Sequence, residues 1–364
     1  MLYNFKKKVI VGMSGGVDSS VAALLLKKKG YYVEGLFMKN WEEDDNKNYC
    51  ASSQDIQDAK SVCNILKINL HVVNFASDYW YNVFERVLLQ YKIGLTPNPD
   101  ILCNKEIKFN LFLKYSINKL YADYIATGHY VRKDENNRLL RGLDLNKDQS
   151  YFLYSISSKQ IQRCLFPLGE LTKKKVRNIA KKNYFLNYNK KNSTGICFIG
   201  KKKFSNFIGK YLPSKSGNII SAHNNKTIGI HKGLIYYTIG QRKGIGIGGC
   251  KNNNKPWYVV KKILSSNQLI VAQGKEHHML MSLSMIINNV HLIDETKIYS
   301  PMYCTVKTRY RQKDMHCVIH PISNNTFKVL LKYPLIAVTP GQSAVFYIND
   351  LCLGGGIIKS INLI

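Results

Sequence analysis

Short apolar runs alternate with longer amphipathic segments in the first half of the chain. Between the first two runs, Val21, Leu24 and Leu25 share one helical face, and Gly30 follows a lysine-rich end, as is typical of a helix C-terminus. The short runs predict buried strands at 9–13, 33–38, 70–75 and 124–127. Strands that alternate with helices predict an α/β fold, in which helices cover both faces of a doubly wound parallel sheet. Ligands of such sheets bind beyond the carboxyl ends of the strands.

The pattern changes after residue 205. Residues 214–256 are rich in glycine, asparagine and lysine, which predicts a small β-rich central domain. Further on, short alternating strands are predicted at 303–307, 317–319, 327–331 and 344–348. Together they predict a C-terminal antiparallel β-barrel. We therefore expect three domains, at 1–204, 205–284 and 285–364.

The string Ser14-Gly15-Gly16-Val17-Asp18-Ser19 joins the first predicted strand to the first predicted helix. Two adjacent glycines let the backbone turn sharply and approach an anion closely. Free N–H groups at the start of the helix, reinforced by its dipole, favour phosphate. We predict phosphate binding here, with Asp18 beside a phosphate-bound magnesium ion; the alternative is a plain glycine turn. The string is not G-x-x-x-x-G-K-[ST], so transfer of a γ-phosphate is not expected.

The strongly positive net charge of the chain predicts a polyanionic partner. The chain has 53 Lys and Arg residues against 23 Asp and Glu residues, which gives a net charge of +30. Such a surface favours nucleic acid and predicts steep salt dependence of binding, although lysine-rich codon bias is an alternative source of the charge. No apolar stretch is long enough to span a membrane, and no signal-peptide cleavage site follows the first apolar run. We expect a cytoplasmic protein without a membrane partner.

The nine cysteines form no C-x-x-C pair and no Cys/His cluster with zinc-like spacing, so no protein-held metal site is predicted. Seven of them are predicted to be small buried core residues: Cys50, Cys63, Cys164, Cys250, Cys304, Cys317 and Cys352. Cys103 and Cys197 differ because each lies inside a dense motif, at 98–105 and 193–198.

The glycine string resembles the pyrophosphatase loop (PP-loop) of the ATP pyrophosphatases. Further segments extend the resemblance to the bacterial tRNA-specific 2-thiouridylase family, at 35–45, 96–109, 126–130, 139–154, 193–200, 240–249, 306–312 and 339–347. The resemblance covers nearly the whole chain. It implies a sulfurtransferase that uses ATP and Mg²⁺ to adenylate the C2 oxygen of the wobble uridine in tRNA. Sulfur from a cysteine persulfide then replaces that oxygen, giving 2-thiouridine, AMP and pyrophosphate.

The resemblance also implies roles for individual residues. ATP binding is expected at Gly12, Met13, Ser14, Gly15, Gly16, Val17, Asp18, Ser19, Met38 and Gly128. Cys197 is expected to carry the persulfide, Cys103 to be the second catalytic thiol, and Asp100 to assist proton transfer. Contacts with tRNA are expected at Asn98, Pro99, Asp100, His129, Lys147, Asp148, Gln149, Arg309, Tyr310 and Gln342.

Simpler interpretations of several of these residues stay open. Met38 is also suited to core packing, Asp100 to capping a turn, and His129 to a structural role. Residues 147–149 are also compatible with a solvated charge run, whereas Arg309 and Tyr310 offer a cation and a stacking face for unpaired bases.

The proposed roles of Cys103 and Cys197 predict how exposed they are and how close they must come. A reactive cysteine needs thiolate character, so we expect partial exposure and nearby cations such as Lys105 and Lys201. Direct reaction between Cys103 and Cys197 requires their Cα atoms to come within about 7 Å, which predicts an open and a closed arrangement of residues 193–200.

The expected partners are tRNAs of the Lys, Glu and Gln acceptor types, and a persulfide donor, either a cysteine desulfurase or a sulfur-relay carrier. Two other functions remain open. One is an ATP pyrophosphatase that forms an amide on a small molecule and needs no paired thiols. The other is a non-catalytic RNA-binding protein that uses ATP as a switch.

Overall fold

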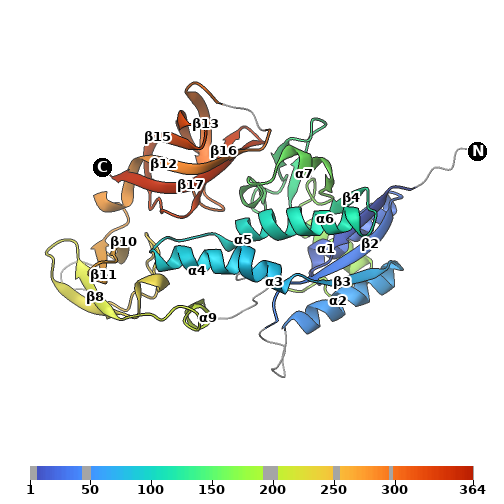
Figure 1. The fold of residues 1–364 in the computed structure, drawn as a ribbon, viewed down its shortest axis with the longest axis horizontal. Coiled ribbons are helices and arrows are strands. Elements are labelled where there is room, and N and C mark those ends of the chain that lie inside the picture. Colours follow the sequence, from blue (N-terminus) through green and yellow to red (C-terminus); the bar gives the residue numbers. More distant parts are fainter. Residues whose placement is uncertain (1–5, 43–50, 192–203, 249–254, 295–297, 364) are drawn as a thin grey trace, which may run out of the picture.

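The computed structural model describes residues 6–42, 51–191, 204–248, 255–294 and 298–363 (Figure 1). Its first part contains a five-stranded sheet in the order β3-β2-β1-β4-β7, and every pairing in it is parallel. The strands are β1 (Lys8–Gly12), β2 (Tyr32–Lys39), β3 (Leu70–Asn74), β4 (Tyr124–Ala126) and β7 (Cys164–Leu165). The first four lie where the apolar runs predicted them, so the α/β prediction is confirmed.

Both faces of this sheet are covered by helices. Val9 and Val11 of β1 belong to one apolar core, whereas Ile10 belongs to the other, as expected for alternating side chains. The first core is completed by α1 (Val17–Lys28), α2 (Ala51–Leu66) and α8 (Lys173–Lys182). The second is completed by α3 (Ala76–Tyr79), the π-helix η1 (Trp80–Phe84), α5 (Pro99–Leu102), the π-helix η2 (Cys103–Leu111), α6 (Phe112–Asn118) and α7 (Ser158–Gln162). Next to η1 the chain continues as α4 (Glu85–Lys92).

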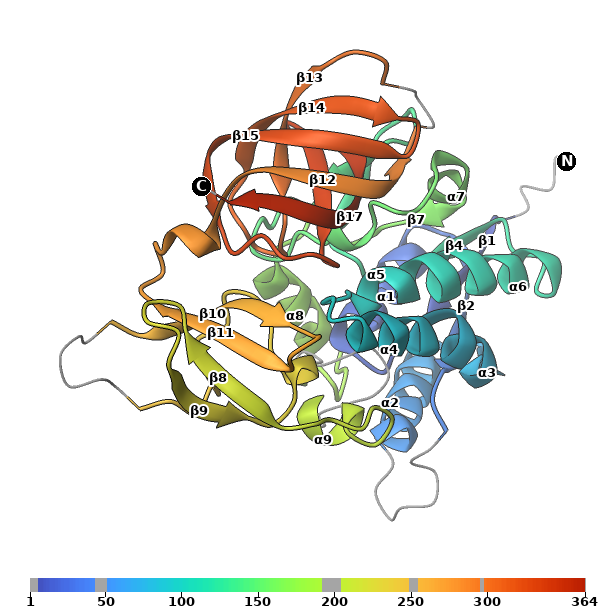
Figure 2. The same cartoon turned by 60° about the vertical axis from the view of Figure 1, so that its left-hand side comes forward.

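The central part is a small four-stranded sheet in the order β10-β11-β8-β9 (Figure 2). Its strands are β8 (Gly217–Ser221), β9 (Thr227–His231), β10 (Trp257–Ile263) and β11 (Gln268–Gln273). The short helix α9 (Phe204–Ile208) precedes it. The predicted β-rich character of this region is confirmed.

The C-terminal part is a closed antiparallel barrel. Six strands follow the order β12-β15-β14-β13-β16-β17, and pairing of β12 with β17 closes the ring. They are β12 (Met281–Leu292), β13 (Met302–Lys307), β14 (Met315–Ser323), β15 (Thr326–Ile336), β16 (Ser343–Ile348) and β17 (Leu351–Leu363). The predicted barrel is therefore confirmed.

One hairpin of the first part joins the barrel sheet. Strands β5 (Val131–Lys133) and β6 (Leu139–Arg141) extend it, because Leu140 pairs with Leu351 of β17. Arg141 is buried beneath this junction: its guanidinium lies 3.8 Å from the ring centre of Tyr347 and donates to Asp314 at 2.9 Å. The sheet of the barrel thus includes residues from the predicted first domain.

Among the described residues, no helix combines the length and the apolar character needed to cross a lipid bilayer.

Candidate active site

The glycine-rich loop lies between the carboxyl end of β1 and the start of α1, where a parallel sheet places its ligand site. Hydrogen bonds within the loop fix its curvature. The backbone N–H of Ser14 donates to Ser19 Oγ at 3.2 Å, and Ser19 Oγ donates to the Gly16 carbonyl at 3.0 Å. Gly16 is the N-cap of α1 and offers no side chain for capping, so the first turn keeps backbone N–H groups for an anion.

Two glycines leave no room for a side chain at this loop. Gly15 has φ +67°, and a Cβ there would lie 2.3 Å from the backbone oxygen of Asp55. Gly128, just after β4, packs so closely on α1 that a Cβ would lie 2.8 Å from the Ser19 nitrogen. The backbone of α2 at Asp55 and that of α1 at Ser19 therefore approach the loop region so closely that neither glycine can carry a side chain without a shift.

Asp18 is held by two partners that were not identified from the sequence. Lys173 Nζ contacts its two carboxylate oxygens at 2.6 and 2.7 Å, and the hydroxyl of Tyr130 donates to Oδ1 at 2.7 Å. Burial raises the pKa of Tyr130, and the charge of Asp18 raises it further, so this hydroxyl stays protonated and donates. Tyr130 lies in the segment 126–130 that carries part of the resemblance, but neither partner is near Asp18 in the sequence, so these contacts could not be predicted from it.

The second support of the loop comes from residues just after α8. Asn187 Nδ2 donates to the Gly15 carbonyl and to Ser20 Oγ, both at 3.0 Å. Lys190 Nζ donates to the same carbonyl at 3.2 Å and bridges to Asp55 and Asp58. These residues were also missed from the sequence, because they lie far from the glycine string along the chain.

The arrangement fits a nucleotide with its magnesium ion. At the carboxyl end of β2, Asn40 is 2% exposed, and both atoms of its amide lack a hydrogen-bond partner within the described part of the chain. Such a buried amide is costly unless a ligand completes its hydrogen bonds. Asp18 is the acid of the loop, and Mg²⁺ commonly binds one or two carboxylates together with substrate phosphates. In the described ranges no group of three or more His, Cys, Asp or Glu side chains is placed to hold a metal by itself.

The segment that carries the predicted base contacts lies between the sheet core and the barrel. Asn98 caps α5, since its Oδ1 accepts from the N–H groups of Asp100 and Ile101 at 3.2 and 3.4 Å. Asp100 therefore lies in the first turn of a helix and is not itself the cap. The barrel touches this segment directly: Gln342 Nε2 donates to the Thr96 carbonyl at 2.8 Å, and the Pro340 carbonyl accepts from Thr96 N–H at 3.2 Å. Gln342 of the barrel thus contacts the start of the segment that also carries Asn98 and Asp100.

Comparison with known proteins identifies the family. Three family models match in succession: "tRNA methyl transferase HUP domain" at residues 7–201, "tRNA methyl transferase PRC-barrel domain" at 205–273 and "Aminomethyltransferase beta-barrel domain" at 282–358. The tRNA-specific 2-thiouridylase MnmA of Blochmanniella pennsylvanica is 58% identical over 365 residues, covering 99% of each chain. That of Pectobacterium atrosepticum is 58% identical over 360 residues, covering 98% of each. The chain belongs to the tRNA-specific 2-thiouridylase family.

Among solved structures, the NMN synthetase of Francisella tularensis is similar to part of the chain. The two are 20% identical, and the aligned region covers 56% of this chain and 73% of the synthetase, with a TM-score of 0.35. This similarity is too low to support any functional argument.

The predicted partial exposure of Cys103 is wrong. Cys103 was expected to be partly exposed, but its exposed fraction is 0%. The reason is that residues 99–111 form the continuous helical turns of α5 and η2, and Cys103 joins Ile107 and Phe109 in the apolar core. Cys197 and the segment 193–200 lie outside the described residues, so the predicted approach of the two thiols stays a prediction.

Three residues that were predicted to contact tRNA form hydrogen bonds within the protein. His129 is 8% exposed and shares a 2.8 Å hydrogen bond with Thr127, as a structural histidine would; its contact with tRNA stays a prediction. Asp148 is 4% exposed and accepts from the N–H groups of Gly142 and Ser150. Arg309 Nη2 donates to the carbonyls of Ile239 and Ala337 at 3.0 and 2.6 Å, which joins the barrel to the central sheet.

Three further predicted site residues also have neighbours within the protein. Gln149 Oε1 accepts from the Tyr130 N–H at 3.0 Å, and Lys147 is half-buried. The ring of Tyr310 packs on Phe152 with centroids 4.5 Å apart, so one of its faces is already in contact. Met38, of the predicted adenine pocket, is 7% exposed and packs in the core near Gly12.

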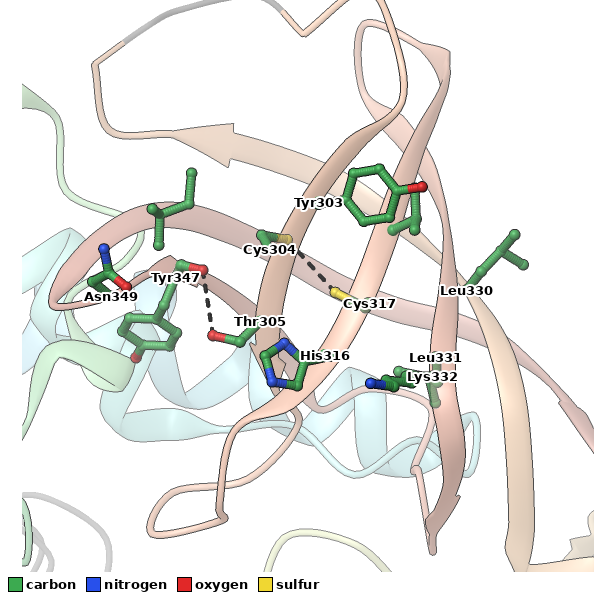
Figure 3. Close-up of a pocket in the computed structure, with 12 residues that line it drawn as sticks. Tyr303, Cys304, Thr305, His316, Cys317, Leu330, Leu331, Lys332, Tyr347 and Asn349 are labelled. Carbon is green, nitrogen blue, oxygen red and sulfur yellow. Dashed lines mark hydrogen bonds between the residues drawn. The ribbon is translucent and has the colours of Figure 1, made fainter.

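A cavity of about 430 Å³ lies elsewhere, on the barrel (Figure 3). Cys304 and Cys317 face each other across β13 and β14, with their sulfur atoms 3.5 Å apart. The hydrogen bond with Cys304, together with burial, raises the pKa of the Cys317 thiol. None of the predicted site residues lines this cavity. Cys63, Cys164 and Cys352 are also buried, so five of the seven structural cysteines are confirmed, whereas Cys50 and Cys250 lie outside the described residues.

Proposed function

We propose that this protein is a tRNA uridine 2-sulfurtransferase that uses ATP to replace the C2 oxygen of a wobble uridine with sulfur. The observation that carries the proposal is the glycine-rich loop at the end of β1, on a sheet whose core also holds the helical segment that bears Asp100 and Cys103. The barrel contacts the start of that segment, since Gln342 donates to the Thr96 carbonyl. Full-length relatives named tRNA-specific 2-thiouridylases support the same activity.

The ATP half of the reaction rests on the residues of the loop. Residues 12–19, together with Met38 and Gly128, would bind ATP, and Asp18 would hold the accompanying Mg²⁺. When bound, Mg²⁺ neutralises phosphate charge and favours departure of pyrophosphate. The uridine O2 attacks the α-phosphate, the bond to the β-phosphate breaks, and pyrophosphate leaves. Asp100, in the first turn of α5, would accept the N3 proton of the base.

The sulfur half needs both thiols. Cys197 would carry the persulfide, and the Cys103 thiolate attacks its inner sulfur, forming a disulfide and releasing hydrosulfide. Hydrosulfide attacks C2 and AMP leaves, giving the C2=S bond. An external thiol then reduces the disulfide. Because Cys103 is buried here, the covering side chains of the core must move before it reacts. The π-helix that begins at Cys103 supports such a site, since π-helical turns are rare and frequently functional.

The substrate is proposed to be tRNA of the Lys, Glu and Gln types, attracted by the strongly basic chain. A cysteine desulfurase or a relay carrier would load Cys197. The wobble base must be turned out of the anticodon stack, at about a few kcal/mol.

Reconstitution tests the proposal. Purified protein, tRNA transcript, Mg-ATP and a persulfide donor should yield 2-thiouridine by nucleoside mass spectrometry, with matching AMP and pyrophosphate. Cys103→Ser and Cys197→Ser should abolish 2-thiouridine, whereas Cys164→Ala, a buried cysteine outside the site, should retain it.

The two other functions give different results. An amide-forming synthetase would cleave ATP without tRNA and would tolerate Cys197→Ser. A non-catalytic RNA-binding protein would bind tRNA without releasing pyrophosphate. Either result excludes the sulfurtransferase.

A further inference from the structure

Two cysteines of the barrel face each other across neighbouring strands. Cys304 of β13 pairs directly with Cys317 of β14 in an antiparallel register, and their sulfur atoms lie 3.5 Å apart (Figure 3). Directly paired residues of antiparallel strands have Cα atoms about 4.5 or 5.5 Å apart, and a disulfide needs about 4.4–6.8 Å. The backbone therefore already meets the requirement for a disulfide, and only small movements of the two side chains are needed to form the S–S bond.

The pair is also more accessible than the other buried cysteines. The exposed fraction is 8% for Cys304 and 4% for Cys317, against 1% or less for the other cysteines within the described residues. Both line the cavity of about 430 Å³, and His316 and Lys332 line it too. A small oxidant can thus reach these sulfur atoms, and the positive charge of Lys332 favours an attacking thiolate.

The hydrogen bond between the two thiols assigns them different roles. This bond with Cys304, followed by burial, raises the pKa of the Cys317 thiol. Cys317 therefore keeps its proton and donates it to the sulfur of Cys304, which stabilises a thiolate there. Cys304 is thus the attacking sulfur, and Cys317 is the sulfur that completes a disulfide.

We propose that Cys304 and Cys317 form an oxidation site, which hydrogen peroxide closes to a disulfide and small thiols reopen by exchange. The Cys304 thiolate attacks one peroxide oxygen, the O–O bond breaks, and hydroxide leaves, giving a sulfenic acid. The hydroxide takes the proton of Cys317, whose sulfur attacks the sulfenic acid and expels a second hydroxide. In total, two thiols and one hydrogen peroxide give one disulfide and two waters, and two electrons pass from sulfur to oxygen.

The disulfide would close a hairpin that carries predicted tRNA contacts. Arg309 and Tyr310 lie in the turn between β13 and β14, and Arg309 also joins the barrel to the central sheet. A bond between residues 13 positions apart restricts the unfolded chain, so the oxidised hairpin should resist unfolding better than the reduced one. Oxidation would thus preserve the geometry of this turn. The competing explanation is that both cysteines are small core residues and nothing more.

Peptide mass spectrometry distinguishes the two explanations. Reduced full-length protein is treated with hydrogen peroxide, blocked with N-ethylmaleimide in denaturant and digested with trypsin without reduction. Trypsin cuts between the two cysteines, for example after Lys307. We expect most molecules to yield the two peptides joined with loss of two hydrogens, and dithiothreitol to separate them. Cys164 is the internal control: it is buried, its thiol donates to the Gln160 carbonyl, and it should be recovered as a free thiol.

Thermal unfolding gives a second measurement, made in a Cys103→Ser background so that a bond to Cys197 does not contribute. Peroxide should raise the Tm of this protein by several degrees, and addition of Cys304→Ser should remove the rise. Free thiols at both positions after peroxide, or sulfinic acid in place of the joined peptides, would overturn the inference; an unchanged Tm would overturn the stabilising effect. If the Cys304→Ser variant does not fold, the peptides of the natural protein still decide. The result is independent of ATP, tRNA and sulfur transfer, so it stands or falls separately from the proposed function.

Discussion

At two glycines of the phosphate-loop region, neighbouring backbone atoms leave no room for a side chain. Gly15 combines a positive φ with so close an approach to Asp55 that an added Cβ would lie 2.3 Å from its backbone oxygen, a contact that no side-chain rotation relieves. At Gly128, an added Cβ would lie 2.8 Å from the Ser19 nitrogen. Function at this loop therefore depends on the absence of two side chains as much as on the groups that are present.

Gly15→Ala is expected to lower the free energy of unfolding by about 1–3 kcal/mol and to abolish ATP binding, because the loop must shift away from Asp55. Thermal unfolding and nucleotide binding by calorimetry measure both effects. Gly229→Ala is the control: its nearest atom lies at 3.5 Å, so the change should stay within about 1 kcal/mol. ATP binding that survives Gly15→Ala would contradict the close approach.

His129 predicts a dependence of stability on pH. Burial lowers its pKa well below the ordinary value, and the charge of Lys108 adds to this. The unfolded chain binds a proton near pH 6.5 and the folded chain does not, so stability is intact above that pH and falls as pH drops below it. His129→Gln should remove this loss, worth about 1–2 kcal/mol at pH 5. Urea unfolding at several pH values compares the two proteins; parallel curves would refute the prediction.

At the scale of elements, the sequence predicts strands where periodicity is local. The apolar runs of β1 to β4 and the alternation in β13 to β16 depend on neighbouring residues, so those strands were predicted correctly. Hairpin β5–β6 was not, because each strand has three residues and its pairing partner, Leu351, lies far away in sequence.

The same reasoning explains what was missed in the site. The glycine string is a local motif and was predicted. Lys173 lies in a lysine-rich helix that is indistinguishable from a solvated surface until its partner Asp18 is placed beside it. Cys103 was expected to be partly exposed, yet Pro99 opens a helix, a position that proline favours, and the helical segment carries Cys103 into the core.

The contacts of Arg141 should contribute much of the stability of the junction between hairpin β5–β6 and the barrel. Arg141→Met removes the hydrogen bond to Asp314 and the contact with the Tyr347 ring, and should lower the free energy of unfolding by about 2–3 kcal/mol. Arg138→Met is the control, since its pair with Asp134 is local and its side chain is 43% exposed; the expected change is about 0.5 kcal/mol or less. Equal Tm values for the two variants would contradict a special role of Arg141.

At the scale of the whole molecule, net charge predicts the salt response of tRNA binding. Neutralisation of about six phosphates would weaken binding on the order of 10³-fold between 50 and 200 mM salt. Filter binding of a tRNA transcript over this range measures the slope. A flat response would mean that the +30 charge reflects codon usage and not a nucleic-acid surface.

The pairing of β6 with β17 determines which pieces of this protein can exist separately. A fragment ending at residue 204 would retain β5 and β6 but lose the strand that covers their edge. Bare strand edges recruit other chains and promote aggregation. The barrel, expressed separately, would expose the complementary edge of β17. The boundary between the first part and the barrel thus runs through the pairing of Leu140 with Leu351, so we expect each half to be soluble only when both are made as one chain.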